Sequence, residues 1–346
     1  MTGWTVERIV HFGPGDLLVD GLAHFGFHTA DGRYFAVDHR GHAVGLVGAD
    51  GRLEVTIAER PLDAAVPNIA VPLANPMYVD VLADQSIVVS NFGDARLYRI
   101  DLERRTADLL VEGTAIGMRD MGNCVVDRDG TIWVNEVTGC RLWQFDPGGR
   151  VLLTLGDGRP GFEPGAAAFE AAAFSRIYDI RRGPDGRIYV LDSGNFAVRV
   201  VEPGRRRVVT IAGTGGTGYT GDGEDARRAT FGSDPSARYD GPISLSLDNG
   251  GAIYIGDRFN HVVRRIDPAT GLIDTVAGRP DADARLPNRP AERDPARLNL
   301  PEISSMDFGR GRLFVPTDLA DDRGDLIVLR PPRERPRRLR RQFVAV

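Results

Sequence analysis

Residues 250–266 read GGAIYIGDRFNHVVRRI, and two other stretches of the chain follow the same pattern. Residues 185–201 read DGRIYVLDSGNFAVRVV, and residues 129–145 read DGTIWVNEVTGCRLWQF. Each stretch predicts a tight glycine turn, a short apolar strand that ends in an acidic residue, a second turn and a further strand with alternating apolar residues. Because the same local pattern recurs, the chain is a repeat protein built from short antiparallel strands.

Looser copies at 31–47, 84–100 and 310–329 bring the repeat to six units. Each unit predicts four antiparallel strands, which is the signature of a β-propeller blade. The segment TVERIVHFGPG at 5–15 resembles the fourth strand of a unit, and the last unit, at 301–330, lacks that strand. We therefore predict an all-β, six-bladed β-propeller of four-stranded antiparallel blades. The N-terminal strand would close the ring and remove free sheet edges.

The composition agrees with many turns and few long helices, since the chain has 42 Gly and 22 Pro. We expect residues 1–330 to form a single propeller and residues 331–346, PPRERPRRLRRQFVAV, to form an Arg-rich C-terminal extension. The net charge of −5 argues against nucleic acid as a partner. No segment reads as a signal peptide or a membrane span, so we expect a cytoplasmic protein without membrane contact.

The glycine-rich stretch IAGTGGTGYTGDGEDARRATF at 211–231 matches the dinucleotide fingerprint GxGxxG at Gly213, Gly215 and Gly218. That fingerprint needs a helix at its third glycine, whereas YTGDGED follows here and carries acids that repel phosphate. The glycines are therefore expected to form turns in a long linker between blades. The linker residues expected to reach the channel mouth are Tyr219, Asp222, Arg238 and Tyr239.

The chain resembles the NHL-repeat β-propeller family along TIAGTGGTGYTGDGEDARRATF at 210–231 and GPISLSLDNGGAIYIGDRFNHVVRRIDPATGLIDTVAG at 241–278. The resemblance is strong across 175–280, and it is weaker but in register over most of the remaining chain. It implies the propeller fold. It leaves the function open, because NHL propellers include enzymes, RNA binders and protein-binding scaffolds.

Polar residues occupy the starts of the first strands, which lie at the mouth of the central channel in a propeller. We predict that His24, Glu302 and Asp240 act in catalysis at this mouth, as acid–base groups or cation ligands. The residues predicted to contact a substrate are Tyr78, Asn123, Arg176, Tyr178 and Tyr239.

Gluconolactonase-type propellers are similar in shape and hold one divalent cation, commonly calcium, at these strand starts. This similarity implies a Ca²⁺ site made by Glu302, Asn75 and Asp20, all of which offer oxygen ligands. A strict alignment of the repeats retains only Glu302 among them, so metal-free acid–base catalysis by His24 stays open. The three-histidine zinc site of the amidating lyase propeller has only His24 as a counterpart here.

The leading hypothesis is a small-molecule enzyme whose site lies at the loop-covered channel mouth. It would be a lactonase-like hydrolase, or a lyase or isomerase, that uses acid–base or cation-assisted chemistry and no redox cofactor. The alternative is a non-catalytic NHL propeller that serves as a scaffold for a protein or another ligand. The two hypotheses differ in what the mouth should contain. An enzyme needs a pocket with convergent polar groups and shifted pKa values.

Two further sets of residues are predicted to be structural. An acidic or amide residue follows every second strand, where its side chain can accept hydrogen bonds from turn N–H groups. This set comprises Asp38, Asn91, Glu136, Asp192, Asp257 and Asp318. The two cysteines, Cys124 and Cys140, fall on the first and third strands of one unit, beyond disulfide reach, so we expect reduced core thiols.

Overall fold

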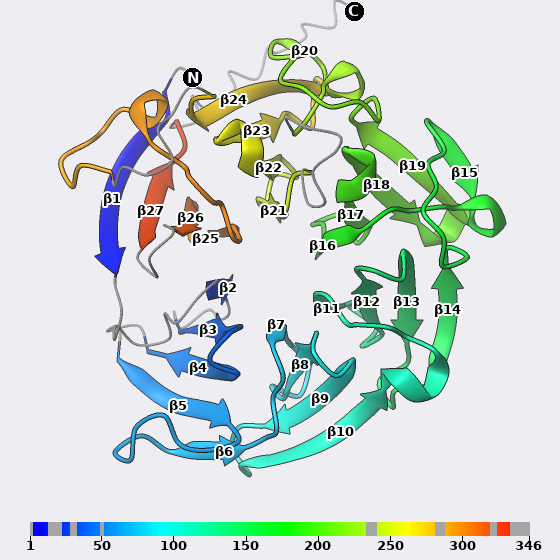
Figure 1. Cartoon of the computed structure of the whole chain (residues 1–346), viewed down its shortest axis with the longest axis vertical. Helices are drawn as coiled ribbons and strands as arrows, with labels where there is room; N and C mark the ends of the chain where they lie inside the picture. The colour runs from blue at the N-terminus through cyan, green and yellow to red at the C-terminus, as the bar shows by residue number, and fades with distance from the viewer. Residues whose placement is uncertain are drawn as a thin grey trace, which may run out of the picture.

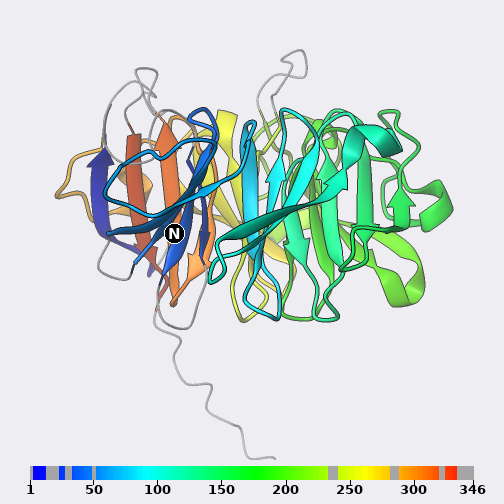
Figure 2. The same cartoon turned by 90° about the horizontal axis from the view of Figure 1, so that it is seen from below.

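The computed structural model describes residues 3–12, 23–27, 33–48, 52–232, 241–280, 288–318 and 324–332. These residues form six mainly antiparallel sheets, or blades, arranged in a ring around a central channel (Figure 1). Seen from the side, the inner strands run roughly along the channel axis (Figure 2). The predicted six-bladed, all-β propeller is confirmed. Blades one, four and five each carry a fifth strand that the sequence did not predict.

Within each blade the strands lie side by side, and the first one is at the channel. From the channel outward, blade one contains β2 (Ala23–Phe27), β3 (Tyr34–Asp38), β4 (Ala43–Val47), β5 (Leu53–Ala58) and β6 (Asn68–Ala70). Blade two contains β7 (Pro76–Val81), β8 (Ile87–Asn91), β9 (Arg96–Asp101) and β10 (Thr106–Glu112). Blade three contains β11 (Cys124–Val126), β12 (Ile132–Glu136), β13 (Arg141–Phe145) and β14 (Val151–Leu155).

Blade four contains β16 (Ile177–Arg182), β17 (Ile188–Asp192), β18 (Ala197–Glu202), β19 (Arg207–Ala212) and β15 (Ala166–Ala168). Blade five contains β21 (Ser244–Leu247), β22 (Ile253–Asp257), β23 (Val262–Ile266), β24 (Leu272–Gly278) and β20 (Glu224–Asp225). Blade six contains β25 (Asp307–Gly309), β26 (Arg312–Asp318), β27 (Gly324–Arg330) and β1 (Thr5–Phe12).

The helices of the described chain are single 3₁₀ turns. They are η1 (Gly113–Ile116), η2 (Phe169–Ala171), η3 (Ser193–Asn195), η4 (Pro203–Arg205), η5 (Ala226–Arg228), η6 (Arg258–Asn260) and η7 (Pro295–Arg297). Within the described ranges, no helix has the length and apolarity that crossing a bilayer requires.

The glycine turns between the first and second strands explain why the repeat is visible in the sequence. Gly130, Gly186 and Gly251 have φ angles of 84°, 78° and 84°. The N–H of each donates a hydrogen bond of 3.0 Å to the carbonyl three residues earlier. Only glycine adopts this backbone conformation without a steric penalty. The turn geometry therefore requires a glycine at the same place in these blades.

The N-terminal strand closes the ring, as the sequence predicts. β1 pairs antiparallel with β27, from Thr5 opposite Arg330 to Phe12 opposite Gly324. The Glu7 carboxylate accepts hydrogen bonds from Arg312 Nε at 2.7 Å and from Arg330 Nε at 3.0 Å. Blade six is thus completed by the opposite end of the chain, which covers the free edge of β27.

Neighbouring blades pack face to face through apolar side chains. Leu97 of blade two and Val134 of blade three lie in one buried cluster, and Leu191 of blade four and Ile255 of blade five lie in another. The alternation of apolar residues along each strand gives every blade two faces to bury in this way. The core of the protein is therefore a series of apolar layers between neighbouring blades.

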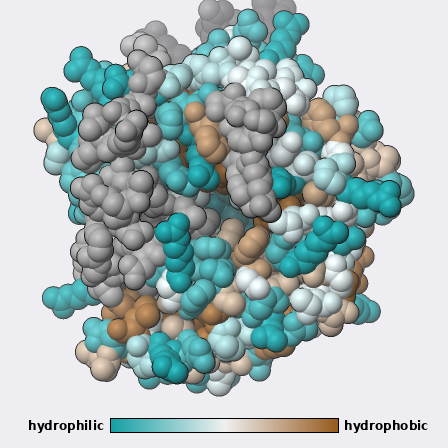
Figure 3. Space-filling view, viewed as in Figure 1, coloured by the Kyte–Doolittle hydropathy of each residue, from teal (hydrophilic) through white to brown (hydrophobic). Residues whose placement is uncertain are grey.

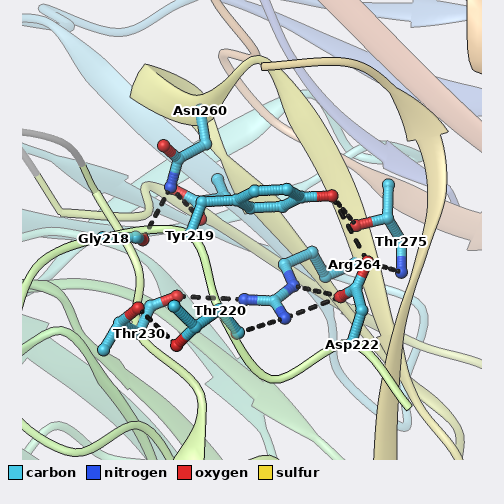
Figure 4. A network of polar contacts seen from close by, with 9 residues as sticks. Gly218, Tyr219, Thr220, Asp222, Thr230, Asn260, Arg264 and Thr275 are labelled. Carbon is cyan, nitrogen blue, oxygen red and sulfur yellow. Dashed lines mark hydrogen bonds and ion pairs between the residues drawn. The ribbon is translucent and has the colours of Figure 1, made fainter.

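The glycine-rich linker lies against the outer part of blade five. Tyr219 and Thr275 share a hydrogen bond of 2.7 Å between hydroxyl oxygens, and Arg264 Nη2 donates to Asp222 Oδ1 at 2.7 Å (Figure 4). The expectation that Tyr219 and Asp222 reach the channel mouth is therefore wrong, because both residues pack around Arg264 on β23. Arg238 and Tyr239 lie outside the described residues.

Gly213 shows that the glycines of this linker serve its backbone path and not the binding of a nucleotide. A Cβ atom at Gly213 would lie 2.1 Å from the carbonyl oxygen of Phe196, and its φ is +92°. Gly215 and Gly218 also have positive φ angles, and no helix begins at the third glycine of the fingerprint. The predicted turn role of these glycines is confirmed.

The acidic residues that follow the second strands anchor the chain where it enters a blade. Asp192 accepts hydrogen bonds from the Ser175 N–H at 2.7 Å and from Asn195 Nδ2 at 2.9 Å. Asp257 accepts them from the Gly232 N–H at 3.0 Å and from Asn260 Nδ2 at 2.8 Å. Their predicted structural role is confirmed in blades four and five, and the side chain of Asp318 lies outside the described part of blade six.

Both cysteines are buried and form no disulfide, as predicted. Cys124 is in β11, and Cys140 immediately precedes β13. Burial raises the pKa of the Cys124 thiol to about 12 and also raises the pKa of Cys140. The two thiols are therefore protonated core groups at neutral pH.

Candidate functional site at the channel mouth

A cavity of about 230 Å³ lies where the inner strands of five blades begin. The space-filling view shows this face hollowed near its centre, where hydrophobic and hydrophilic surfaces meet (Figure 3). One group of lining residues comes from the starts of the first strands. This group comprises Met77, Asn123, Tyr178, Asp179, Ile243, Ser304 and Ser305.

A second group of lining residues comes from the turns after the second strands. It comprises His39, Phe92, Val137, Thr138 and Arg258. Apart from Thr138, each of these follows directly the acidic or amide residue that recurs in every unit. In blades one, two, three and five the residue that follows the recurrent one therefore lines the cavity. Sequence reasoning missed this group. The repeat contained a signal for it, because the residue directly after the recurrent acidic or amide residue differs from one unit to the next.

Asp179 is the polar centre of the cavity lining and is 3% exposed. Its Oδ1 accepts hydrogen bonds from Asn123 Nδ2 at 2.6 Å and from Arg181 Nη1 at 2.5 Å. Its Oδ2 accepts one from the Leu245 N–H at 2.8 Å. Asn123 belongs to blade three and Leu245 to blade five, so this one carboxyl of blade four connects three consecutive blades.

Burial raises the pKa of the Asp179 carboxyl to about 6, and the Arg181 guanidinium is the largest influence opposing that rise. The Arg181 guanidinium carbon lies 4.4 Å from the ring centroid of Tyr78. A cation over an aromatic face is stabilised by the ring quadrupole. Burial also raises the pKa of Tyr78 above its usual range. The lining thus contains a carboxyl that titrates close to neutral pH.

The rim of the cavity carries a second ion pair. Arg258, in the second turn of blade five, pairs through Nη2 with Glu302 Oε1 at the start of blade six. His39, in the second turn of blade one, also lines the cavity. Burial lowers the pKa of its imidazole. At neutral pH His39 is therefore an uncharged polar group in the lining.

The structure brings together some of the sequence-predicted site residues. Asn123 and Tyr178 line the cavity, and Glu302 contacts it through Arg258. Tyr78 is buried beneath Arg181, and Met77 beside it lines the cavity instead. Arg176 lies at the entrance to β16 with a φ of 49° and is not part of the lining.

Other predicted residues are placed elsewhere or lie outside the described chain. Asn75 holds the junction between blades one and two, where its N–H donates to His42 Nδ1 at 2.9 Å and its Nδ2 donates to the His39 carbonyl at 3.0 Å. His24 pairs in β2 with Val37, and its side chain is not described. Asp20, Tyr239 and Asp240 lie outside the described residues.

Two of the three residues named for calcium, Glu302 and Asn75, make contacts of their own. Glu302 is neutralised by Arg258, which lowers its attraction for a cation, and Asn75 is engaged at a blade junction. Among the described residues, no three His, Cys, Asp or Glu side chains come together as metal ligands. The Glu302, Asn75 and Asp20 site stays a prediction from the sequence, and no step of a mechanism is derived through it.

Comparisons with known proteins agree with this architecture. No protein-family model matches the chain. NHL repeat-containing protein 2 of Gallus gallus is 26% identical over 133 residues, which is 34% of this chain and only 17% of that protein. Among solved structures, virginiamycin B lyase from Staphylococcus aureus has a TM-score of 0.56 at 13% identity, covering 92% of this chain and 98% of that chain.

A gluconolactonase from Xanthomonas campestris has a TM-score of 0.52 at 17% identity, covering 90% of this chain and 88% of that chain. Structural matches at such low sequence identity show a shared fold, and the chemistry has to be argued from the site itself.

Proposed function

We propose that this chain, an NHL-type six-bladed β-propeller, is a small-molecule enzyme whose active site is the cavity at the channel mouth. The reaction would be a hydrolysis, as in a lactonase, or a lysis or isomerisation. The observation that carries this proposal is a buried carboxyl with a raised pKa, Asp179, in the lining of an otherwise largely apolar cavity. The structural neighbours that are named as a lyase and a lactonase support it at the level of fold.

Asp179 suits the role of a proton acceptor. A pKa of about 6 leaves the carboxyl mostly ionised at neutral pH while keeping it a far stronger base than an ordinary aspartate. A carboxylate oxygen can accept two hydrogen bonds, and Oδ2 accepts one from the Leu245 N–H within the described residues. Arg181 and Asn123 hold Oδ1, and the backbone N–H groups of Leu245 and Ile180 also donate to the carboxyl, so its orientation is fixed.

The other lining groups would orient a substrate. Arg258 is a donor at the rim, and Asn123 lies next to Asp179. Met77, Phe92 and Ile243 supply apolar surface that excludes water and strengthens electrostatic interactions within the cavity. In this proposal Tyr178 contacts the substrate from β16, one residue before the carboxyl that receives the proton.

A turnover screen tests the proposal. Proton release from a panel of lactones and simple esters would be measured near neutral pH for the wild type and for Asp179→Asn, Ile243→Trp and Leu272→Trp. Ile243→Trp fills the cavity, whereas Leu272→Trp makes a comparable change on the outer strand β24, where Leu272 is exposed. We expect turnover to be lost in the first two variants and retained in the third. Full activity of Ile243→Trp would place the chemistry elsewhere and overturn the proposal.

The alternative is a ligand-binding or scaffold role for the same face. The observation that favours it is that both charged pairs at the cavity, Asp179 with Arg181 and Arg258 with Glu302, are already satisfied within the protein. Such pairs also occur as purely structural elements. Binding of a panel compound that Ile243→Trp blocks, without turnover of any compound, would support this role.

A further inference from the structure

A groove of about 680 Å³ lies between blades five and six, on the face opposite the channel mouth. Its lining includes residues 248–250 in the first turn of blade five, Asp267 in the turn before β24, and Gly311 in the first turn of blade six. These turns lie at the other end of the strands from the second turns, which line the cavity at the channel mouth. The volume is within the range of roughly 300–1,000 Å³ that is typical of ligand sites.

Three aromatic rings form one wall of this groove. The ring centroids of Trp4 and Tyr254 are 5.7 Å apart, edge to face, and the rings of Tyr254 and Phe308 stack at 5.5 Å. Trp4 is 7% exposed, and its Nε1 donates to none of the described residues. Nε1 is also not one of their buried side-chain atoms without a partner, so a molecule outside the protein can reach it. Because a buried indole N–H usually has an acceptor, this wall offers a hydrogen bond to a bound carbonyl.

The groove is acidic. Its lining contains three carboxylates, those of Asp248, Asp267 and Asp274, and one guanidinium, that of Arg265, which leaves a formal charge of −2. The Tyr254 hydroxyl donates to Asp248 Oδ2 at 2.9 Å, and Arg265 Nη1 donates to Asp267 Oδ2 at 3.1 Å. Asp274 is exposed and makes no hydrogen bond or ion pair within the described part of the chain. The groove therefore suits a positively charged ligand, with one carboxylate available to pair with it.

The chain itself carries such a ligand at the edge of the groove. Pro331 and Pro332 belong to the lining, and a Cβ atom at Gly3 would lie 2.7 Å from the Cβ of Pro332. Residues 333–346, RERPRRLRRQFVAV, follow directly, lie outside the described residues, and contain six Arg and one Glu. Their positive charge complements that of the groove, and covalent attachment gives them a high local concentration there. Arginine and proline side chains also pack favourably on aromatic rings.

We propose that this groove is the docking site of the chain's own Arg-rich segment, residues 333–346. Guanidinium groups of the segment pair with Asp274, and one of its main-chain carbonyls accepts the hydrogen bond of Trp4 Nε1. The proposal is independent of the proposed function, because the groove and the cavity at the channel mouth share no lining residue. It gives the Arg-rich extension, which the cavity does not explain, an acidic partner surface on the same chain.

The indole N–H signal of Trp4 in an NMR spectrum tests the proposal on the full chain. Isotope-labelled tryptophan would give one indole signal for each of the three tryptophans, and Trp4→Phe would identify that of Trp4. The wild type would be compared with a full-length chain, the glutamine chain, in which six arginines are replaced by Gln. These arginines are Arg333, Arg335, Arg337, Arg338, Arg340 and Arg341.

We expect the Trp4 signal to differ between the two chains, while the signals of Trp133 and Trp143 in blade three coincide. A synthetic peptide of residues 333–346, added to the glutamine chain, should return the Trp4 signal to its wild-type position. Asp274→Arg in the glutamine chain should weaken this peptide binding about tenfold, because an attraction becomes a repulsion. Asp108→Arg is the matched control, because Asp108 is exposed on β10 of blade two, and it should leave the binding unchanged.

Three results would overturn the proposal. An identical Trp4 signal in the wild type and the glutamine chain would show that the segment does not occupy the groove. Equal binding of the peptide to both chains would assign the groove to a segment of another molecule. Equal weakening by Asp274→Arg and Asp108→Arg would reduce the binding to attraction between net charges. None of these results bears on the cavity at the channel mouth, so the proposed function is tested separately.

Discussion

Arg264 of β23 binds the Asp222 carboxylate, 42 residues earlier in the chain, through Nη2 at 2.7 Å and Nε at 3.2 Å. The same guanidinium donates to the carbonyls of Thr220 at 2.7 Å and Thr230 at 3.0 Å (Figure 4). A single buried cation thus determines the path of the glycine-rich linker. Arg199 occupies the corresponding position in blade four, where Nη1 donates to the Ala173 carbonyl at 2.6 Å.

Replacement of Arg264 should destabilise the protein strongly. Arg264→Met would leave the carbonyls of Thr220 and Thr230 and the Asp222 Oδ1 atom without the guanidinium donor. We expect the free energy of unfolding to fall by about 3 kcal/mol, the low end of the range for a broken buried ion pair. The low end applies because the Asp222 side chain is 38% exposed and can be hydrated. Guanidinium denaturation followed by tryptophan fluorescence would measure the change.

Arg227→Met is the matched control, because Arg227 forms an exposed ion pair with Asp225 in the same linker. Exposed pairs contribute less than about 1 kcal/mol, so this variant should unfold close to the wild type. Similar losses in both variants would contradict the anchoring role of Arg264.

Two buried carboxyls should make the protein less stable as the pH rises from 4 towards 6. Burial raises the pKa of Asp179 and of Asp192 from 3.8 to about 6. Between these values the two folded-state carboxyls hold protons that they release in the unfolded chain, so their contribution to the free energy of unfolding decreases with rising pH. Asp179→Asn should flatten this part of the curve, which denaturation midpoints at a series of pH values would show.

Asp225→Asn serves as the control for that experiment. Its side-chain hydrogen bond with Arg227 lowers the pKa of Asp225 from 3.8 to about 2, so its contribution changes only below pH 3.8. The curve of this variant between pH 4 and 6 should therefore follow the wild type. An Asp179→Asn curve that runs parallel to the wild type between pH 5 and 6 would argue against the raised pKa of Asp179.

Closure of the ring should depend on the N-terminal segment. Trp4 is buried, and its ring lies 5.7 Å from that of Tyr254, edge to face, between blades five and six. We expect Trp4→Ala to lower the free energy of unfolding by about 3–5 kcal/mol because of the cavity it creates. Thr5→Ala, at the exposed neighbouring position, should have little effect. Calorimetry of both variants would decide whether this contact holds the ring closed.

The cysteines should be inert in the folded protein. Cys124 and Cys140 are buried, and burial raises the pKa of both thiols, so little reactive thiolate forms at neutral pH. Ellman's reagent should therefore modify neither thiol until denaturant is added, when both should react. Leu109→Cys, at an exposed position of β10, provides a thiol that should react at once. Rapid modification of the native wild type would show that a blade opens readily.

Sequence reasoning worked best where the repeat reflects local backbone demands. Gly186 and Gly251 recur because the same turn needs the same positive φ angle in each blade. Asp192 and Asp257 recur because each anchors its own blade entrance. These features repeat with the period of the chain, so one sequence suffices to recognise them.

The site was predictable only in part. Asn123 and Tyr178 were identified because strand starts lie at the channel mouth, and the structure places both in the cavity lining. Phe92 and Arg258 were missed because they lie in second turns, which approach the cavity from different blades. Tyr219 was wrongly assigned to the channel mouth. The position of its ring is set by contact with Arg264, which lies far along the chain and which a local sequence pattern does not reveal.

The sequence by itself determined the four recurrent strands of each blade, their turns, the number of blades and the closure of the ring, because these follow from short-range patterns repeated along the chain. Only the tertiary structure decided which side chains meet at the channel mouth and how they titrate. The Asp179 carboxyl lies between Asn123 of blade three and Leu245 of blade five, and its pKa depends on the burial that this arrangement creates. Contacts of this kind form between residues distant in sequence once the ring has closed, so local sequence patterns do not record them.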